Sequence, residues 1–352
     1  MDEATSFSVP GNRIRDEKQT QRKLPRAKIS EKPARAFALR ETDAEFTVFY
    51  EKVNNLHMTL LRSVFLFMML MPVSSCGGHE QIEAATDDIG REVHLSQPVD
   101  RIVSLAPNVT ELIFAAGAGH KLIAIGAADD FPPAVDTISR ISTLPVDAER
   151  IVVMRPDLVL ATDQVNSLRD AQTFDNIDVP VYFLRFEQLA DIPRAIEVIG
   201  ELAGTTEDAL KRAAEIRQQF DSWRIEESDG SPPRVLFLIG YETLYSFGKG
   251  SYVHEMISLA GGQSLTQDVS SAAPVLSEEY VLDRAPEIIL GAFPDGFGAT
   301  ELASKYPSWQ SVPAIQSGNV YSIEPDYVFR PGPRVVDGIE AMREVIQAGD
   351  RR

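Results

Sequence analysis

The feature that most constrains the fold of this chain is a repeated pattern whose two copies lie 130 residues apart. In the first copy, Asp147 and Glu149 precede an apolar stretch, a proline and a second apolar run. In the second copy, Ser277 and Glu279 stand at the matching positions. Each copy is typical of a short capped helix that leads into a buried strand. The repeat therefore predicts two lobes of similar construction, with Glu149 and Glu279 at equivalent places.

Short apolar runs of the strand type alternate with helical patterns along the chain. This alternation favours a mainly parallel sheet that is covered by helices on both faces. After the first run, Asn108 and Glu111 have the spacing of a capping box that opens a helix, and Gly117 is suited to end that helix. The predicted strands are Arg101–Leu105, Ile123–Ile125, Leu158–Leu160 and Val181–Leu184, then Arg234–Ile239, Ile288–Leu290 and Val320–Ile323.

Between these two groups of strands, residues 191–227 follow a helical period. One predicted helix ends at Gly204, and the next opens with the acidic turn Thr206–Asp208 and carries Leu210 and Phe220 on its apolar face. The predicted fold class is therefore α/β, with two lobes that have mainly parallel central sheets and are joined by a long helix.

The segment after Met58 has the features of an export signal. Its apolar run, Ser63–Met71, is too short to cross a bilayer and fits the h-region of such a signal. The following Val73–Cys76 resembles a bacterial lipoprotein signal, in which the cysteine becomes the lipidated N-terminus. The alternative is a buried apolar segment with an incidental cysteine. Residues 1–57 have mixed charges and no sustained apolar period, so we expect Met58 to be the true start.

These patterns predict the organisation of the whole chain. The mature protein would lie outside the cytoplasm, in the periplasm or at the cell surface, as a membrane-anchored lipoprotein. The predicted parts are a mis-assigned or disordered leader over 1–57, a lipoprotein signal segment over 58–76, a tether and lead-in over 77–98, an N-terminal α/β lobe over 99–190, a helical segment with the interlobe helix over 191–230, and a C-terminal α/β lobe over 231–350.

The charge balance limits the partners of the chain. It has 34 Lys and Arg against 52 Asp and Glu, a net charge of −18, and the excess acid lies beyond residue 77. Such a field repels phosphate backbones, so no nucleic-acid partner is expected. The chain contains one cysteine, which cannot form an internal disulfide.

The common catalytic patterns are missing from the sequence. It has neither a Gly-x-Ser-x-Gly elbow nor a His-Glu-x-x-His helix, and Gly248–Ser251 resembles a phosphate loop but lacks the required leading glycine and the Ser or Thr after the lysine. His120 and His254, the histidines within the predicted lobes, are too few for a transition-metal cage. We therefore predict no catalytic residues, no metal ligands and no cofactor.

Aromatic and charged residues follow several predicted strands, where open α/β sheets place their ligands. Taken singly, each is better explained by packing or loop structure than by ligand contact. Their recurrence at one end of both lobes gives a ligand site equal weight with that alternative. The candidate ligand-binding residues are Phe131, Tyr241, Tyr245, Asp326, Tyr327 and Arg330.

Four motifs, in order and spacing, resemble the cobalamin and iron-siderophore substrate-binding proteins of ABC importers, nearest the cobalamin branch. The resemblance implies two α/β lobes that are bridged by one long rigid helix and hold the ligand in the cleft between them. It extends from about Arg91 to Ile346. The motifs are Arg101–Glu111, Asp130–Pro133, Glu149–Val152 with Arg155–Ala161, and Arg330–Gly338.

The resemblance also implies roles for individual residues. Glu149 and Glu279 would dock against arginines of the importer's permease, which works with an ATPase; helix capping is the simpler alternative for both. Asp326 and Arg330 match positions for polar ligand contacts, and Phe131 matches an aromatic residue that faces the corrin ring.

The chain departs from the family pattern at two positions, because Leu144 and Ala273 stand where tryptophans are expected. Stacking of a large planar ligand would then fall to Phe131, Tyr241 and Tyr245.

The expected function is capture of a corrinoid by a monomeric, lipid-anchored binding protein that delivers it to an ABC importer. A ferric siderophore or haem is the alternative ligand. From other classes, the alternatives are an enzyme on a similar scaffold, such as a metal chelatase, and a surface sensor without a permease.

Overall fold

The computed structural model describes residues 81–224 and 231–350. By its contacts the chain divides into residues 1–77 and a compact unit of residues 78–352, which contains every described element. The predicted leader over 1–57, the signal segment over 58–76 and the lipidation site at Cys76 lie outside the described residues.

The first lobe is built on a five-stranded parallel sheet with the strand order β5-β4-β3-β6-β7. Its centre is β3, which pairs Ile102 with both Leu122 and Leu158. The sequence predicted four of these strands and missed β5, a short edge strand with one fully buried residue. The strands are β3 (Ile102–Ser104), β4 (Leu122–Gly126), β5 (Ser139–Ile141), β6 (Leu158–Thr162) and β7 (Val181–Leu184).

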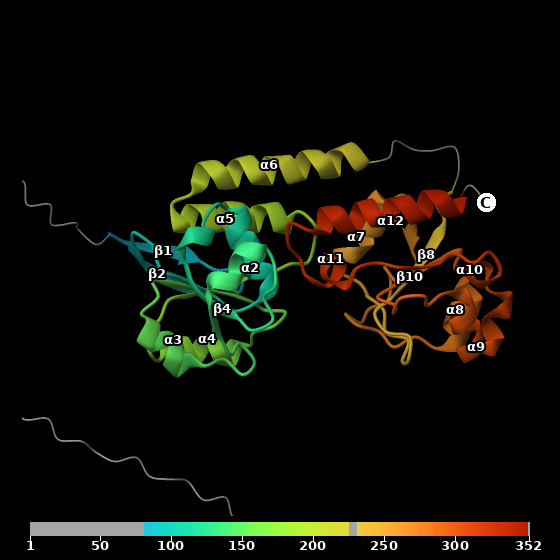
Figure 1. The fold of residues 1–352 in the computed structure, drawn as a ribbon, viewed down its shortest axis with the longest axis horizontal. Coiled ribbons are helices and arrows are strands. Elements are labelled where there is room, and N and C mark those ends of the chain that lie inside the picture. The colour runs from blue at the N-terminus through green and yellow to red at the C-terminus, as the bar shows by residue number, and fades with distance from the viewer. Residues whose placement is uncertain (1–80, 225–230, 351–352) are drawn as a thin grey trace, which may run out of the picture. The chain divides into compact units, whose positions relative to one another are not determined.

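Helices cover both faces of this sheet because neighbouring strand residues point to opposite sides. Ile102 belongs to the apolar cluster formed with α2 (Pro107–Ala115) and α5 (Asp191–Ala203), whereas Val103 belongs to the cluster formed with α3 (Ala148–Met154) and α4 (Leu168–Asp175). Figure 1 shows these two pairs of helices on either side of the strands.

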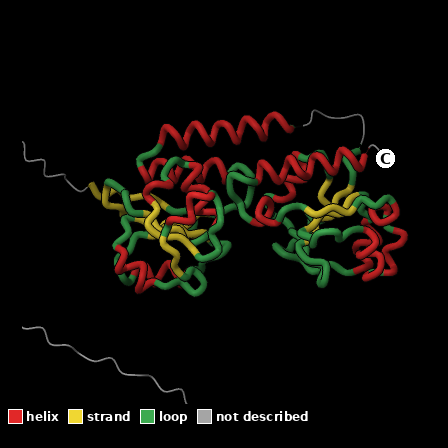
Figure 2. The backbone as a smooth tube through the Cα atoms, in the orientation of Figure 1, coloured by secondary structure: helices red, strands yellow, loops and turns green. Residues whose placement is uncertain are grey.

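The second lobe repeats this plan with a four-stranded parallel sheet in the order β11-β10-β8-β9. Phe237 faces α7 and α12, and Leu238 faces the cluster that contains α8 and α9. In Figure 2 the strands of each lobe lie between helices. The elements are β8 (Arg234–Leu238), α7 (Val253–Leu259), β9 (Gln263–Ser264), α8 (Glu278–Arg284), β10 (Ile288–Gly291), α9 (Ala299–Lys305), α10 (Pro313–Gln316), β11 (Val320–Ser322), α11 (Pro325–Phe329) and α12 (Val335–Asp350).

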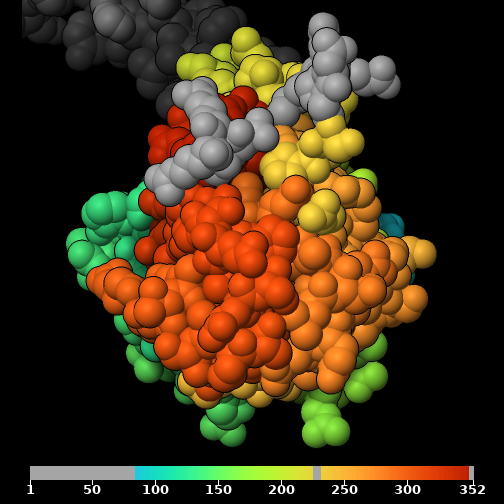
Figure 3. All heavy atoms as spheres, turned by 90° about the vertical axis from the view of Figure 1, so that its right-hand side faces the viewer, coloured from blue at the N-terminus to red at the C-terminus, as the bar shows by residue number. Residues whose placement is uncertain are grey.

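Figure 3 shows the second lobe end-on, with the orange surface of α8, α9, α10 and their connecting loops towards the viewer.

Three short 3-10 helices complete the described elements: η1 (Gly119–Lys121), η2 (Pro133–Thr137) and η3 (Pro307–Ser311).

The long helix between the two sheets is α6 (Thr206–Trp223), which packs along α5. Helix α5 ends at Gly204 in the left-handed conformation, as predicted. Leu210 was predicted on the apolar face but is 51% exposed. The buried face instead follows Ala209, Ala213, Ile216 and Phe220, about one residue step away around the helix. The predicted α/β fold class, with two parallel-sheet lobes and a long linking helix, is confirmed.

The internal repeat is confirmed at the level of side-chain contacts. Asp147 caps α3 by accepting a hydrogen bond from the Arg150 N–H, and Ser277 caps α8 by accepting one from the Tyr280 N–H. Both helices end in a left-handed residue that is not glycine, with φ of 48° at Arg155 and 45° at Ala285.

In each copy of the repeat, an arginine side chain donates hydrogen bonds to carbonyl oxygens at the C-terminal end of the helix. This arginine lies at the start of β8 in one copy and just before β3 in the other. Arg101 donates to the carbonyl oxygens of Met154 and Arg155 at the end of α3. Arg234 donates to the carbonyl oxygen of Ala285 at the end of α8. The two lobes therefore share a helix-to-strand unit in detail, which places Glu149 and Glu279 in the exposed first turns of matching helices.

Two local predictions were wrong or incomplete. Helix α2 begins at Pro107, after Ala106, and no side chain caps it, because proline is favoured at the first helical position and starts the helix before Asn108. The segment 77–98, predicted as tether and lead-in, contains an antiparallel hairpin of β1 (Gln81–Thr86) and β2 (Glu92–Gln97). The boundaries predicted for the lobes stay a prediction.

Candidate ligand-binding site

A cavity of about 410 Å³ lies where strands of both sheets end. Gln164 follows β6, Phe186 follows β7 and Ile239 follows β8, so both lobes contribute to its wall. The carboxyl ends of parallel strands are the usual place for ligands in open α/β sheets. The full lining is Gln164, Phe186, Ile239, Phe247, Lys249, Gly250, Ser251, Tyr252, Ala272 and Phe329.

Two other hollows are larger but lie in less suitable places. One, of about 540 Å³, is an open depression over α9, η3 and α10 within one lobe. The other, of about 460 Å³, lies among α5, α6 and α7. Apart from Leu189 and Ala190, at the far end of the segment from β7 to α5, its lining residues belong to these helices or their ends. Position at the strand ends, rather than volume, makes the 410 Å³ cavity the candidate site.

Three phenylalanines give the candidate site its apolar wall. Phe329 packs against Phe247 with ring centroids 5.9 Å apart, and both rings contact Phe237 beneath them. The Tyr252 hydroxyl donates to the Val328 carbonyl oxygen at 2.5 Å, and burial raises the pKa of Tyr252, so this phenol stays neutral. The wall offers a flat or large apolar ligand an aromatic surface.

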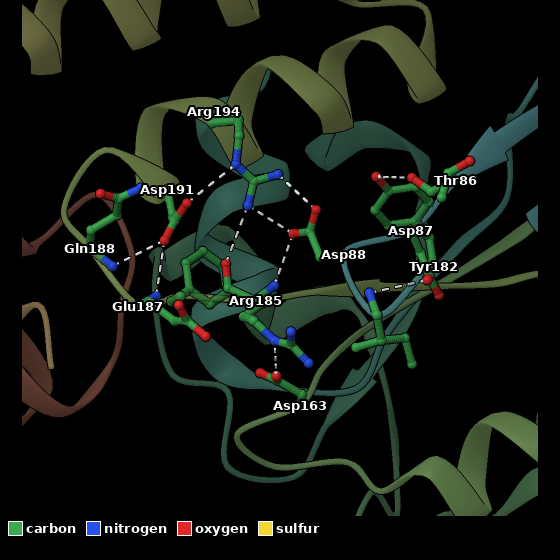
Figure 4. A network of polar contacts seen from close by, with 12 residues as sticks. Thr86, Asp87, Asp88, Asp163, Tyr182, Arg185, Glu187, Gln188, Asp191 and Arg194 are labelled. Carbon is green, nitrogen blue, oxygen red and sulfur yellow. Dashed lines mark hydrogen bonds and ion pairs between the residues drawn. The ribbon is translucent and has the colours of Figure 1, made fainter. Parts of the chain in front are cut away.

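The segment that leads from β7 to α5 is held by the polar network shown in Figure 4. Asp88 accepts two hydrogen bonds of 2.8 Å from Arg194 and one from the Arg185 N–H. Asp191 accepts from the N–H groups of Glu187 and Gln188. These contacts fix the backbone on both sides of Phe186, so the first lobe presents this ring to the cavity in a set position.

A second network joins the two lobes beside α2. Glu111, whose side chain is 2% exposed, accepts hydrogen bonds of 2.7 and 2.9 Å from Arg334. Burial raises the pKa of Glu111, against the effect of Arg334. Asn108 donates to the Pro331 carbonyl oxygen at 3.4 Å. Asn108 and Glu111, predicted to cap α2, therefore serve instead as contacts to the second lobe.

The same network contains four of the six predicted ligand-binding residues. Arg330 binds Asp130 at 2.6 Å and Asp326 at 3.0 Å, which lowers the pKa of Asp130. Arg334 lies over the rings of Phe131 and Tyr327, at 4.6 and 5.8 Å from their centroids. The structure thus brings Phe131, Asp326, Tyr327 and Arg330 together, although none of them lines the cavity.

The two remaining predicted residues lie elsewhere in the second lobe. Tyr241 packs against Phe297 and Phe293, with centroids 4.4 and 6.1 Å away. Tyr245 is 43% exposed and forms isolated β-bridges with Gly240 and Val275. Neither lines the cavity, so ligand contact by these six residues stays a prediction.

Sequence reasoning missed most of the cavity wall. Phe329 belongs to the aromatic and charged residues that follow the predicted strand Val320–Ile323, and the sequence indicated it as part of that group. Phe186 and Phe247 have the pattern of ordinary apolar residues, and nothing in their spacing brings their loops together. The available signal was position, since Gln164 and Phe186 each follow a predicted strand within a few residues and Ile239 is the last residue of one.

Asp129, next to the interlobe network, is a buried carboxyl group from which we expect the stability of the protein to depend on pH. Its side chain is buried at 3% exposure, Thr110 donates to Oδ1, and Oδ2 has no hydrogen-bond partner among the described residues. Burial raises the pKa of Asp129 from 3.8 to about 6. A raised carboxyl pKa stabilises the fold below about pH 4, and this contribution is lost as the pH rises through about 6.

We expect Asp129→Asn to remove this dependence. Relative to the variant, the wild type should lose about 3 kcal/mol of unfolding free energy between about pH 4 and 7, because each pKa unit corresponds to about 1.4 kcal/mol. Urea unfolding at several pH values measures the difference. Asp136→Asn is the matched control, since Asp136 also faces Arg140 but is exposed. Parallel pH curves for the wild type and Asp129→Asn would contradict the prediction.

The described residues contain no group of three or more His, Cys, Asp or Glu side chains that could hold a metal ion. His254 uses both ring nitrogens within the fold, at 2.8 Å from Ser264 Oγ and 2.7 Å from the Gly248 carbonyl oxygen. Among the helices between residues 81 and 350, leaving aside 225–230, none has the length and apolarity needed to cross a membrane.

Two parallel-sheet lobes, a linking helix and an aromatic cavity at the strand ends define a ligand-binding protein. The family model for periplasmic binding proteins matches residues 102–327. The chain therefore belongs to the periplasmic binding protein family, and it is a binding protein and not an enzyme. The resemblance drawn from the four motifs is confirmed.

Named relatives bind vitamin B12. The chain is 28% identical to a vitamin B12-binding protein of Vibrio cholerae over 69% of this chain and 87% of that protein. It is 30% identical to the vitamin B12-binding protein of Pectobacterium carotovorum over 67% of this chain and 84% of that protein.

Solved structures show the same fold. The periplasmic vitamin B12-binding protein of Vibrio cholerae aligns with a TM-score of 0.63 at 26% identity, covering 72% of this chain and 99% of that chain. The periplasmic haem-binding protein of Vibrio cholerae aligns with a TM-score of 0.62 at 20% identity, covering 70% and 98%. At that lower identity the likeness concerns the fold alone.

Proposed function

We propose that this protein captures a cobalamin-like corrinoid and delivers it to an ABC importer. The observation that carries the proposal is the aromatic cavity at the carboxyl ends of strands from both sheets, lined by Phe186, Phe247 and Phe329. A corrin ring is broad and largely apolar on its faces, so it suits stacking against such a wall. Vitamin B12 is also the ligand named for relatives that share 28–30% identity with this chain.

The proposal places the ligand between the lobes, close to the network of Glu111 and Arg334. Arg330 and Asp326 belong to this network, and Arg330 is the next residue after Phe329, which lines the cavity. A ligand that enters the cavity could extend polar side chains toward them. Lobe closure around the ligand would be limited by the interlobe ion pairs that the structure already contains.

The proposal assigns the permease contact to Glu149 and Glu279. Both are exposed in the first turns of equivalent helices. Hydrogen bonds from its own backbone N–H and from Ser277 lower the pKa of Glu279, so this carboxylate stays charged. Glu149 is followed one turn later by Val153, which is 80% exposed. Two carboxylates on one rigid body can engage two arginine sites together.

The remaining parts of the proposal concern location. We propose that Cys76 carries a lipid anchor and that the segment after it tethers a monomeric binding unit outside the cytoplasm. Mass spectrometry of the protein from its native membrane, with a diacylglyceryl mass on Cys76 as the expected result, tests the anchor.

Calorimetric titration tests the ligand. Purified protein should bind cyanocobalamin with a Kd below about 1 μM, corresponding to about −8 kcal/mol, and should bind haem and a ferric siderophore at least about tenfold more weakly. Tight binding of haem or the siderophore without binding of cyanocobalamin would overturn the corrinoid assignment.

A variant pair connects the binding to the cavity. Phe329→Ala removes one aromatic wall and is expected to weaken cyanocobalamin binding about tenfold, because burial of an aromatic side chain contributes about 1–3 kcal/mol. Leu168→Ala, at a 65% exposed apolar residue outside the cavity, should leave the affinity unchanged. Equal affinities for the wild type and Phe329→Ala would place the ligand elsewhere.

A further inference from the structure

The loop Gly248–Ser251, which resembles but does not match a nucleotide phosphate loop in sequence, forms part of the cavity wall. Lys249, Gly250 and Ser251 all line the cavity. The loop lies between Phe247, another lining residue, and helix α7. A segment that the sequence analysis left without a function therefore sits in the candidate ligand site.

The backbone of this loop is held firmly. The Gly248 N–H donates to the Ala272 carbonyl oxygen, the Lys249 N–H donates to the Val269 carbonyl oxygen, and His254 lies 2.7 Å from the Gly248 carbonyl oxygen. A Cβ at Gly248 would stand 1.6 Å from the Ser271 carbonyl oxygen, so only glycine allows this close approach. Lys249 therefore extends from a fixed point on the rim of the cavity.

Lys249 is the one charged residue among the ten that line the cavity. No ion pair of its ammonium group occurs among the described residues. The side chain of Lys249 is exposed. Of the other described lysines, Lys121 and Lys305 form ion pairs and Lys211 forms none. Because Lys249 is exposed, water screens its charge. An anionic group held in the cavity beside the aromatic side chains would displace part of this water, which would strengthen its attraction to the ammonium group.

We propose that Lys249 binds an anionic group of the captured ligand and so selects for ligands that combine a large apolar face with a phosphate or carboxylate. This inference rests on the proposed function for the identity of the group. In a corrinoid with a complete nucleotide tail, the group is the phosphodiester of that tail.

The test compares two corrinoids that differ in this group. Cyanocobalamin contains the phosphodiester and dicyanocobinamide lacks it. In protein purified from cells that express the full chain, Lys249→Met should weaken cyanocobalamin binding about 10- to 100-fold, the value of one charge-assisted hydrogen bond. The same variant should leave the affinity for dicyanocobinamide unchanged.

Two further variants separate charge from structure. Lys249→Arg keeps the positive charge and should retain cyanocobalamin affinity within about threefold. Lys211→Met removes an exposed lysine on α6, outside the cavity, and should change neither affinity. Wild-type binding of cyanocobalamin should weaken with added salt, and binding by Lys249→Met should not.

The possible results distinguish this inference from the proposed function. Equal losses for both corrinoids, or no loss for either, would overturn the role of Lys249 and leave corrinoid capture intact. If the wild type binds neither corrinoid, the proposed ligand is wrong, and the test is repeated with haem, which has free carboxylates, and with its dimethyl ester, which lacks them. If Lys249→Met then loses affinity for haem but not for the dimethyl ester, anion binding by Lys249 is supported. Equal affinities of the wild type and Lys249→Met for haem, or binding of none of the four probes, overturns it.

Discussion

Replacing Glu149 and Glu279 together by alanine is expected to abolish ligand import while leaving ligand affinity unchanged. The two residues occupy equivalent exposed first turns in the two lobes and lie outside the cavity wall. Each carboxylate that meets an arginine in trans forms a charge-assisted contact. Uptake of cyanocobalamin in cells and stimulation of the importer's ATPase measure the result.

The expected loss of affinity for the permease depends on whether one or both carboxylate contacts are removed, because the two contacts are made by one rigid body. Loss of one contact should weaken docking about tenfold or more, whereas loss of both removes the gain from simultaneous engagement and should weaken docking more than about 100-fold. The double variant is therefore expected to lose more than either single variant. The contacts should also weaken with salt because both groups are exposed.

Glu207→Ala is the matched control, because Glu207 is an exposed glutamate in the first turn of α6. It should lose only the small helix-dipole contribution of a few tenths of a kcal/mol and should import normally. Normal import by the double variant would contradict the permease assignment and would favour a sensor that binds ligand without a permease.

The sequence was sufficient to predict the two-lobed fold because the fold depends on local patterns. The helix, proline and strand unit occurs twice, and in both copies the polar residue at its start caps the helix. Buried parallel strands also appear as continuous apolar runs, which made β6, β7, β8 and β10 recognisable.

The candidate site was less predictable because it depends on contacts across the chain. Asn108 and Glu111 have capping-box spacing, yet Pro107 begins the helix and both side chains contact residues more than 220 positions away. Lys249 lies in a loop that fails the phosphate-loop pattern, and its relevance comes only from the cavity that the two lobes form. Tertiary contacts of this kind leave no period or spacing in the sequence.

Arg334→Met is expected to destabilise the protein by about 3–5 kcal/mol, the usual loss when one partner of a buried ion pair is removed. The Glu111 side chain is 2% exposed and that of Arg334 is 14% exposed. Without Arg334, the nearest cation to Glu111 is Arg330 at 3.8 Å, which is too far for a hydrogen bond. Urea unfolding at pH 7 measures the change.

Arg217→Met provides the control, because Arg217 pairs with Glu197 but both side chains are partly exposed, at 44% and 28%. Its expected loss is below about 1 kcal/mol. If Arg334→Met costs no more than Arg217→Met, the interlobe ion pair has no special role in stability.

The double variant Glu111→Gln with Arg334→Met shows whether the loss comes from the unpaired carboxylate or from lost packing. If the charge is responsible, removing the carboxylate should recover most of the stability lost in Arg334→Met. Lowering the pH should have the same effect on Arg334→Met, because burial already raises the pKa of Glu111 and protonation removes the uncompensated charge. If instead the contacts of Arg334 with Phe131 and Tyr327 dominate, the double variant should remain as unstable as Arg334→Met at every pH.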